Sequence, residues 1–273
     1  MRRRAARSDG DVEEVRAVRV AIVLIGDELL AGHTRDANAH WMAQRLTALG
    51  HRLRRVVIVP DEAHMVHEAL DSSALIAEVV LVSGGLGPTH DDRTTEIIAD
   101  RFARNLVVDA NAWGKLVARY GSRAGVTEAA RESARKMVTV PEGAEVLDNP
   151  VGAACGYVLR EGGIAYVVMP GVPAELQAIF DVHVVGKILP HAERVGLVEV
   201  DVEMAEAMFA KELGLVAQRF ADLEIGSYPH FGERRVTLRF KGDEKRAREA
   251  LEAFFGAIPE AKARVVRGPI GTL

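Results

Sequence analysis

The sequence predicts an α/β protein with a three-layer, mostly parallel sheet, followed by a second, smaller α+β domain. Short apolar runs alternate with stretches of helical periodicity, which is typical of βα units. The runs carry no regular polar alternation, which indicates strands buried on both faces. We expect a poorly ordered, solvated tail over 1–17, the large domain over 18–190 and the small domain over 191–273.

The large domain is expected to contain three early strands, a later hairpin and several helices. The strands fall at 18–25, 55–59 and 78–82, and Glu161-Gly162-Gly163 predicts a hairpin between 157–160 and 164–169. Apolar spacing predicts helices over 41–49, 62–73, 94–102, 113–120 and 127–137, with a further helix beginning at Pro173.

The alternation of predicted strands and helices changes after Leu189 and Pro190, and we place the domain boundary there. Beyond it, strands are expected at 197–204, 224–227 and 235–240, and a helix at 243–255. The sequence shows no internal repeat and no low-complexity tract.

Composition excludes several classes of protein. The 273 residues include 35 Lys and Arg against 39 Asp and Glu, and this net charge of -4 gives no overall reason to expect nucleic-acid binding. One cysteine, Cys155, excludes an intrachain disulfide framework. No apolar run approaches the length of a membrane span, and no apolar segment follows the arginines of the tail as a signal peptide requires. We therefore expect a cytoplasmic protein that binds neither nucleic acid nor membrane.

The loop after the third strand, Ser83 to Asp92, is the strongest candidate for a binding site. Glycines at 84, 85 and 87 allow a sharp turn that brings backbone N–H groups close to an anion, and Ser83 and Thr89 add hydroxyl donors. Asp91 and Asp92 place two carboxylates beside this cradle. Carboxylates next to a phosphate make physical sense when a divalent cation lies between them.

The sequence of this loop also fits a purely structural interpretation. The glycines can simply form a tight turn, with Asp92 as the N-cap of the next helix. The sequence lacks a P-loop and a Gly-x-Gly-x-x-Gly motif after its first strand, which disfavours kinases and dinucleotide dehydrogenases. His33, His40 and His90 lack the spacing of paired zinc ligands.

Three other loops follow predicted strands, where ligands of open α/β sheets bind. The residues that we assign to substrate contact there are Gly26, Asp27, Asn38, Asn149, Gly152, Pro170 and Gly171. Glu28 is a candidate base or water-positioning residue, Asp36 a candidate helix cap, and Glu175 faces either the cleft or solvent. Cys155 is expected to be a buried small hydrophobe, since no partner histidine is identifiable.

Together, these loops resemble a known family. The motifs are Gly26-Asp27-Glu28-Leu29-Leu30, Gly32, Asp36 and Asn38, then Ser83 to Thr94, then Asn149-Pro150-Val151-Gly152, then Pro170-Gly171-Val172-Pro173-Ala174-Glu175. Over about residues 18 to 190 the chain is similar to the competence/damage-inducible protein A (CinA-like) family. The amino-terminal part of that family is a molybdopterin-binding (MoaB/Mog-like) domain, also similar to the first domain of some eukaryotic FAD synthases.

The resemblance implies metal-dependent cleavage of a nucleotide pyrophosphate, with ADP-ribose as the favoured substrate. It implies a divalent cation (Mg²⁺, Mn²⁺ or Co²⁺), which K⁺ can accompany, held by Asp91 and Asp92 as catalytic ligands. Phosphate contacts would come from Gly84, Gly85, Gly87 and Thr89. A non-catalytic binder of molybdopterin or a nucleotide, or an oligomeric scaffold, would use the same loops.

Departures from the family limit what carries over. Ser83 stands where relatives commonly have Thr, a conservative change for a hydroxyl donor. Gly152-Ala153-Ala154-Cys155-Gly156 stands where relatives have Gly-Thr-Ala-Pro-Gly, so one hydroxyl and one proline are missing. Full-length bacterial relatives continue into a deamidase domain, and since this sequence ends at Leu273 we do not expect that activity here. The second domain looks like the family's small KH-like module. Its Gly268-Pro269-Ile270-Gly271 is misplaced for RNA binding, so we expect a structural or dimerising role and a homo-oligomer.

Overall fold

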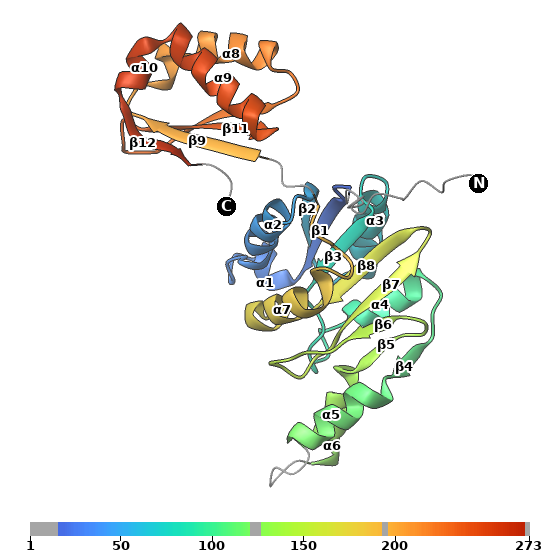
Figure 1. Ribbon diagram of the computed structural model, residues 1–273. Coiled ribbons are helices and arrows are strands. Elements are labelled where there is room, and N and C mark those ends of the chain that lie inside the picture. Colours follow the sequence, from blue (N-terminus) through green and yellow to red (C-terminus); the bar gives the residue numbers. More distant parts are fainter. Residues whose placement is uncertain (1–15, 121–126, 193–195, 271–273) are drawn as a thin grey trace, which may run out of the picture. The chain divides into compact units, whose positions relative to one another are not determined.

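The computed structural model describes residues 16–120, 127–192 and 196–270, and these form two compact units, one on each side of the gap at 193–195 (Figure 1). Nearly all of the expected tail, residues 1–15, lies outside the described residues. None of the described helices is long and apolar enough to cross a membrane.

The first unit is built on a six-stranded sheet in the order β2-β1-β3-β8-β7-β6. The first four strands in this order are parallel, and β7 and β6 are antiparallel to their neighbours, so the expected mostly parallel α/β sheet is confirmed. The strands are β1 (Arg19–Ile25), β2 (Arg52–Val59), β3 (Val79–Ser83), β6 (Glu145–Leu147), β7 (Gly156–Glu161) and β8 (Ile164–Met169). The predicted hairpin is the β7–β8 pair.

Burial along the strands follows their place in the sheet. The central strand β3 is buried at every residue, and β1 is buried after its first residue. The expectation of two buried faces is wrong for β2, where exposed and half-buried residues alternate. Strand β2 lies at the sheet edge and has one neighbour, so its exposed face carries arginines at Arg52 and Arg54.

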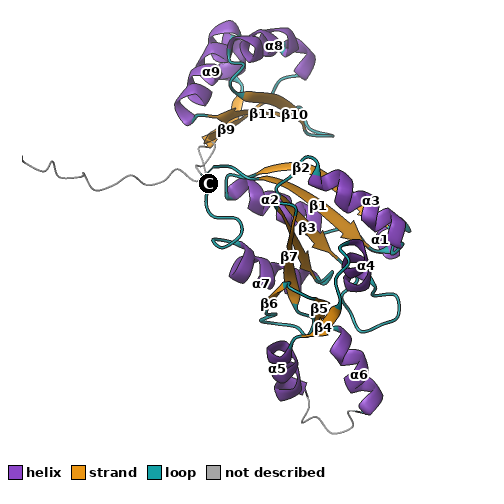
Figure 2. Cartoon of the chain, turned by 90° about the vertical axis from the view of Figure 1, so that its right-hand side faces the viewer, coloured by secondary structure: helices purple, strands orange, loops and turns teal. Residues whose placement is uncertain are grey.

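Helices cover both faces of this sheet (Figure 2). On one face, α2 and α7 bury Met42, Leu46 and Leu176 against β1 and β8. On the other face, α3 and α4 pack Leu70 and Ile97 against the opposite side of the same strands. These helices span Asn38–Ala48 (α2), Ala63–Ala74 (α3), Thr94–Arg101 (α4) and Pro173–Ile179 (α7), the last continued by a π-helical turn at Phe180–Val184.

A helical excursion projects from the sheet between α4 and β6. It consists of α5 (Ala110–Tyr120) and α6 (Glu128–Lys136), carried on a two-stranded antiparallel pair, β4 (Leu106–Val108) and β5 (Thr139–Pro141). Figure 1 shows α5 and α6 extending away from the main sheet. The helices match the sequence prediction, whereas β4 and β5 are too short to give a periodic signal.

The second unit is a four-stranded antiparallel sheet in the order β10-β11-β9-β12, with helices on one face. Its core contains the fully buried rings of Phe209, Phe240 and Phe254, and Phe209 meets Phe254 edge to face at 5.7 Å. Helix α10 and strand β12 were not expected. The elements are β9 (Gly196–Val202), a 3₁₀ turn (Glu206–Met208), α8 (Ala210–Arg219), β10 (Glu224–Pro229), β11 (Val236–Gly242), α9 (Glu244–Ala257), α10 (Pro259–Ala263) and β12 (Val265–Ile270).

Phe254→Ala should lower the free energy of unfolding of the second unit by about 3–5 kcal/mol, because it removes a fully buried ring and leaves a cavity. Phe231→Ala is the matched control, since the Phe231 ring is fully exposed, and it should change stability by less than about 0.5 kcal/mol. Urea denaturation of both variants measures the difference. Equal losses would show that the core is assigned wrongly.

Candidate functional site

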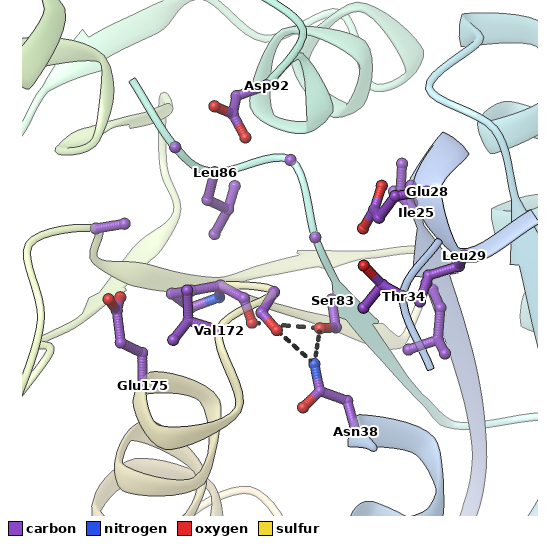
Figure 3. Close-up of a pocket in the computed structure, with 18 of the residues that line it drawn as sticks. Ile25, Glu28, Leu29, Thr34, Asn38, Ser83, Leu86, Asp92, Val172 and Glu175 are labelled. Carbon is purple, nitrogen blue, oxygen red and sulfur yellow. Dashed lines mark hydrogen bonds between the residues drawn. The ribbon is translucent and has the colours of Figure 1, made fainter. Parts of the chain in front are cut away.

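A cleft of about 430 Å³ opens at the carboxyl ends of β1, β3 and β8, where an open α/β sheet binds its ligands (Figure 3). Four loops that the sequence singled out meet here. The predicted site residues that line the cleft are Gly26, Glu28, Asn38, Ser83, Gly84, Gly85, Gly87, Asp91, Asp92, Pro170 and Gly171. Those that do not line it are Asp27, Thr89, Asn149 and Gly152.

Gly84 fixes how the loops meet. Its φ of 116° is in a region that side chains avoid, and a Cβ atom there would lie 2.0 Å from the carbonyl oxygen of Ile25. The Gly84 amide donates to the carbonyl of Met169 at 3.2 Å, and Gly171 passes close to the Gly84 Cα atom. The start of the glycine-rich loop therefore packs closely between the carboxyl ends of β1 and β8.

Asn38 and Ser83 tie three of the loops together. The Asn38 amide donates to Ser83 Oγ at 3.1 Å and to the Gly171 carbonyl at 2.7 Å, and the Ser83 hydroxyl donates to the Pro170 carbonyl at 3.2 Å. Figure 3 shows these bonds at the floor of the cleft. Asp36 accepts from the first N–H groups of α2, as expected of a cap.

The two hydroxyls that the sequence offered as anion donors are used inside the protein. Ser83 is buried and donates to Pro170, while Thr89 lies outside the cleft and donates both its hydroxyl and its backbone N–H to Asp92 Oδ2. Thr89 therefore does not line the cleft as expected, whereas Ser83 lines it with its hydroxyl already bonded to Pro170. The backbone N–H groups of Gly84 and Thr89 are also used within the protein, which leaves those of Gly85 and Gly87 as donors.

Asp92 is not the cap of the following helix. Helix α4 begins at Thr94, its N-cap residue is Arg93, and no side chain accepts a hydrogen bond from its first turn. Asp92 instead turns back onto Thr89 and packs over Gly87, where a Cβ atom would approach Asp92 Oδ2 to 2.4 Å. The glycine at 87 thus makes room for a carboxylate at the edge of the cleft.

Asp61 is a cleft residue that the sequence reasoning missed. It follows β2 directly, which was the available signal, and its Oδ2 accepts from the Asp27 N–H at 3.2 Å. Burial raises the pKa of the Asp61 carboxyl, and the carboxylates of Asp27, Glu28 and Asp91 raise it further, against the hydrogen bond from Asp27. Asp61 thus shares one end of the cleft with Glu28 and Asp91.

The loop at 149–156 presents Glu175 to the other side of the cleft. Asn149 Nδ2 donates to Glu175 Oε2 at 2.7 Å, and Asn149 Oδ1 accepts from the Gly152 amide at 2.7 Å. Asn149 and Gly152 thus support the site from behind, and Glu175 lines it. Cys155 is buried as expected, and burial raises the pKa of its thiol to about 12, which excludes a thiolate nucleophile at neutral pH.

The lining of the cleft is strongly acidic. Its charged side chains are Arg35 on one hand and Glu28, Asp36, Asp61, Asp91, Asp92 and Glu175 on the other. In the parts of the chain that the structure describes, no group of three or more His, Cys, Asp and Glu side chains could hold a metal ion unaided. An anionic ligand therefore needs a cation of its own to reduce repulsion here.

Comparison with known proteins gives the family. Residues 21–191 match the model of the "probable molybdopterin binding domain", a range that includes nearly all of the sheet and the cleft. The chain belongs to this family. Residues 194–266, the second unit, match the model of the "FAD synthase, middle domain".

Relatives of this molybdopterin-binding family member include CinA-like proteins. A protein of Archaeoglobus fulgidus is 36% identical over 85% of this chain and 95% of its own length. A CinA-like protein of Geotalea uraniireducens is 32% identical over 84% of this chain, which spans 54% of that relative. The crystal structure of CinA from Thermoplasma acidophilum is similar with a TM-score of 0.55 and 33% identity, over 60% of this chain and 95% of that one.

Asp61→Asn should melt at the same or a higher temperature than the wild type near neutral pH. The asparagine oxygen can still accept from Asp27, while the carboxylate that the fold disfavours is gone. Because the folded-state pKa is raised, the wild type loses stability as pH rises through it, so the variant's advantage should shrink toward about pH 4. Thermal melting of both proteins from about pH 4 to 7 tests this, and a variant that melts lower at pH 7 would contradict it.

Proposed function

We propose that this protein is a metal-dependent hydrolase of a nucleotide pyrophosphate such as ADP-ribose. One observation carries the proposal: a cleft with backbone N–H groups of a glycine-rich loop and six carboxylates, against a single arginine. Such a lining favours a phosphate-bearing ligand that arrives with a divalent cation. The family's molybdopterin-binding domain and the CinA-like relatives are consistent with a pterin or nucleotide ligand.

The residues present fit a cation of the Mg²⁺ type. Such ions are held by one or two carboxylates together with substrate phosphates, so a complete protein cage is not required. Asp91 and Asp92 would hold the ion, beside Gly85 and Gly87. When bound, it would neutralise charge on the pyrophosphate and favour departure of one phosphate.

The other side chains supply positioning and proton transfer. Hydrolysis forms a bond from a water oxygen to one phosphorus, breaks the P–O–P bridge, and releases one proton from the water. Glu28, the candidate base from the sequence, would accept this proton. Asp61 is a second candidate base, because its raised pKa improves proton acceptance near neutral pH. The N–H groups of the glycine-rich loop would orient the phosphate oxygens.

A second candidate, non-catalytic binding of molybdopterin or a nucleotide, has its own support. The hydroxyls of Ser83 and Thr89 are already hydrogen-bonded within the protein, and Asp92 is engaged by Thr89. The described residues provide no metal cluster of three side chains. The test is a screen of ADP-ribose, FAD and NADH with Mg²⁺, Mn²⁺ and Co²⁺. If the protein is a non-catalytic binder, at least one of these compounds should bind and none should be hydrolysed.

Asp91→Asn and Asp92→Asn should each lower hydrolysis of ADP-ribose by at least roughly a hundredfold and weaken the response to added metal, because each removes a cation ligand. The Asp91 side chain is 72% exposed, so its variant should melt within about 0.5 kcal/mol of the wild type. The Asp92 variant should lose about 1 kcal/mol, since a neutral amide accepts more weakly from Thr89.

The control for this pair is Asp222→Asn, which removes an exposed carboxylate paired with Arg246 in the second unit and should leave hydrolysis unchanged. The measurement is thermal melting alongside hydrolysis over a metal titration. Normal hydrolysis by both site variants, with or without lower melting, would show that they do not hold a cation.

A further inference from the structure

Lys136 reaches the glycine-rich loop from outside the sheet. It is the last residue of α6, in the helical excursion, and its side chain is half-buried, with 28% exposed. Its Nζ donates to the backbone carbonyl of Thr89 at 2.8 Å. The excursion therefore contacts the loop through a charged donor, in a bond of the stronger, charge-assisted kind.

Thr89 connects Lys136 to Asp92 through hydrogen bonds. The carbonyl of Thr89 accepts from Lys136, and its amide, at 2.9 Å, and its hydroxyl both donate to Asp92 Oδ2. Thr89 is exposed, and a hydrogen bond from its side chain also lowers the pKa of the neighbouring Asp91 carboxyl. The position of the Asp92 carboxylate thus depends on a residue that Lys136 holds from the far side.

The surroundings of Lys136 argue against a simple surface ion pair. Its nearest carboxylate is Glu96 of α4 at 3.7 Å, a distance at which a partly exposed pair contributes little. Arg135, the preceding residue, turns elsewhere, to the Trp113 ring and Glu132. A second cavity of about 340 Å³ lies beside the glycine-rich loop and is lined by both Lys136 and Asp92.

We propose that Lys136 is a positioning residue that holds Thr89, and through it Asp92, in the orientation needed to bind the cation of a phosphate ligand. That Lys136 affects hydrolysis rests on the proposed function, whereas its effect on the conformation of the glycine-rich loop does not. Lys136 lines the second cavity and does not line the main cleft, so it acts through the loop and not on the substrate.

The test compares Lys136→Met, which keeps a long side chain without a donor, with Lys136→Arg, which restores a charged donor. Lys262→Met is the control, because it removes a lysine from an exposed pair with Glu252 in the second unit. Hydrogen exchange of the peptide covering residues 83–92 should be roughly tenfold faster in Lys136→Met, with wild-type melting, and near wild type in the other two.

The second readout is a Mn²⁺ titration of ADP-ribose turnover. Lys136→Met should need at least roughly tenfold more Mn²⁺ for half-maximal rate, and Lys136→Arg should recover most of this loss. If the wild type does not turn over ADP-ribose, the proposed function fails, and Mn²⁺-dependent ADP-ribose binding together with the exchange rates decides the role of Lys136. Wild-type exchange in the loop, or an unchanged Mn²⁺ requirement in Lys136→Met, would overturn the proposal.

Discussion

The close approach of the glycine-rich loop to the ends of β1 and β8 is the constraint on which the site depends. Gly84 fills a space in which the carbonyl of Ile25 leaves no room for a side chain, and Gly171 lies against it from the other side. Asn38 then bonds to both Ser83 and Gly171, so three loops distant in sequence act as one rigid floor. The backbone donors and carboxylates of the cleft take their positions from this floor.

Sequence periodicity predicted the sheet and its helices because burial on both faces leaves an unbroken apolar run, as in β3. It could not reveal β4 or β5, where three-residue strands carry no period. The positions of the acidic loops were predictable because strand ends meet at one edge. Hydrogen-bond partners were not, so the Thr89 hydroxyl was expected to face a ligand although it donates to Asp92. Asp61 was missed because it follows the edge strand without a glycine-rich motif.

The helical excursion adds a level of support that the sheet alone does not give. Lys136 of α6 donates to Thr89 in the glycine-rich loop, and Arg119 of α5 donates to the carbonyls of Gly152 and Pro150 in the loop behind Glu175. Both contacts run from a cation to backbone oxygen, so they support the shape of the loops, and neither cation lines the cleft. The side chains that line the cleft thus stay mostly acidic, which suits a ligand that brings its own cation.

The most direct test of this account is calorimetric binding of ADP-ribose to the wild-type protein with Mn²⁺ and, separately, with EDTA. The acidic cleft predicts binding in the micromolar range with Mn²⁺ (about -8 kcal/mol) and at least roughly a hundredfold weaker binding with EDTA, because the carboxylates repel an unaccompanied pyrophosphate. Equal affinity under the two conditions would contradict the claim that a cation joins ligand and protein.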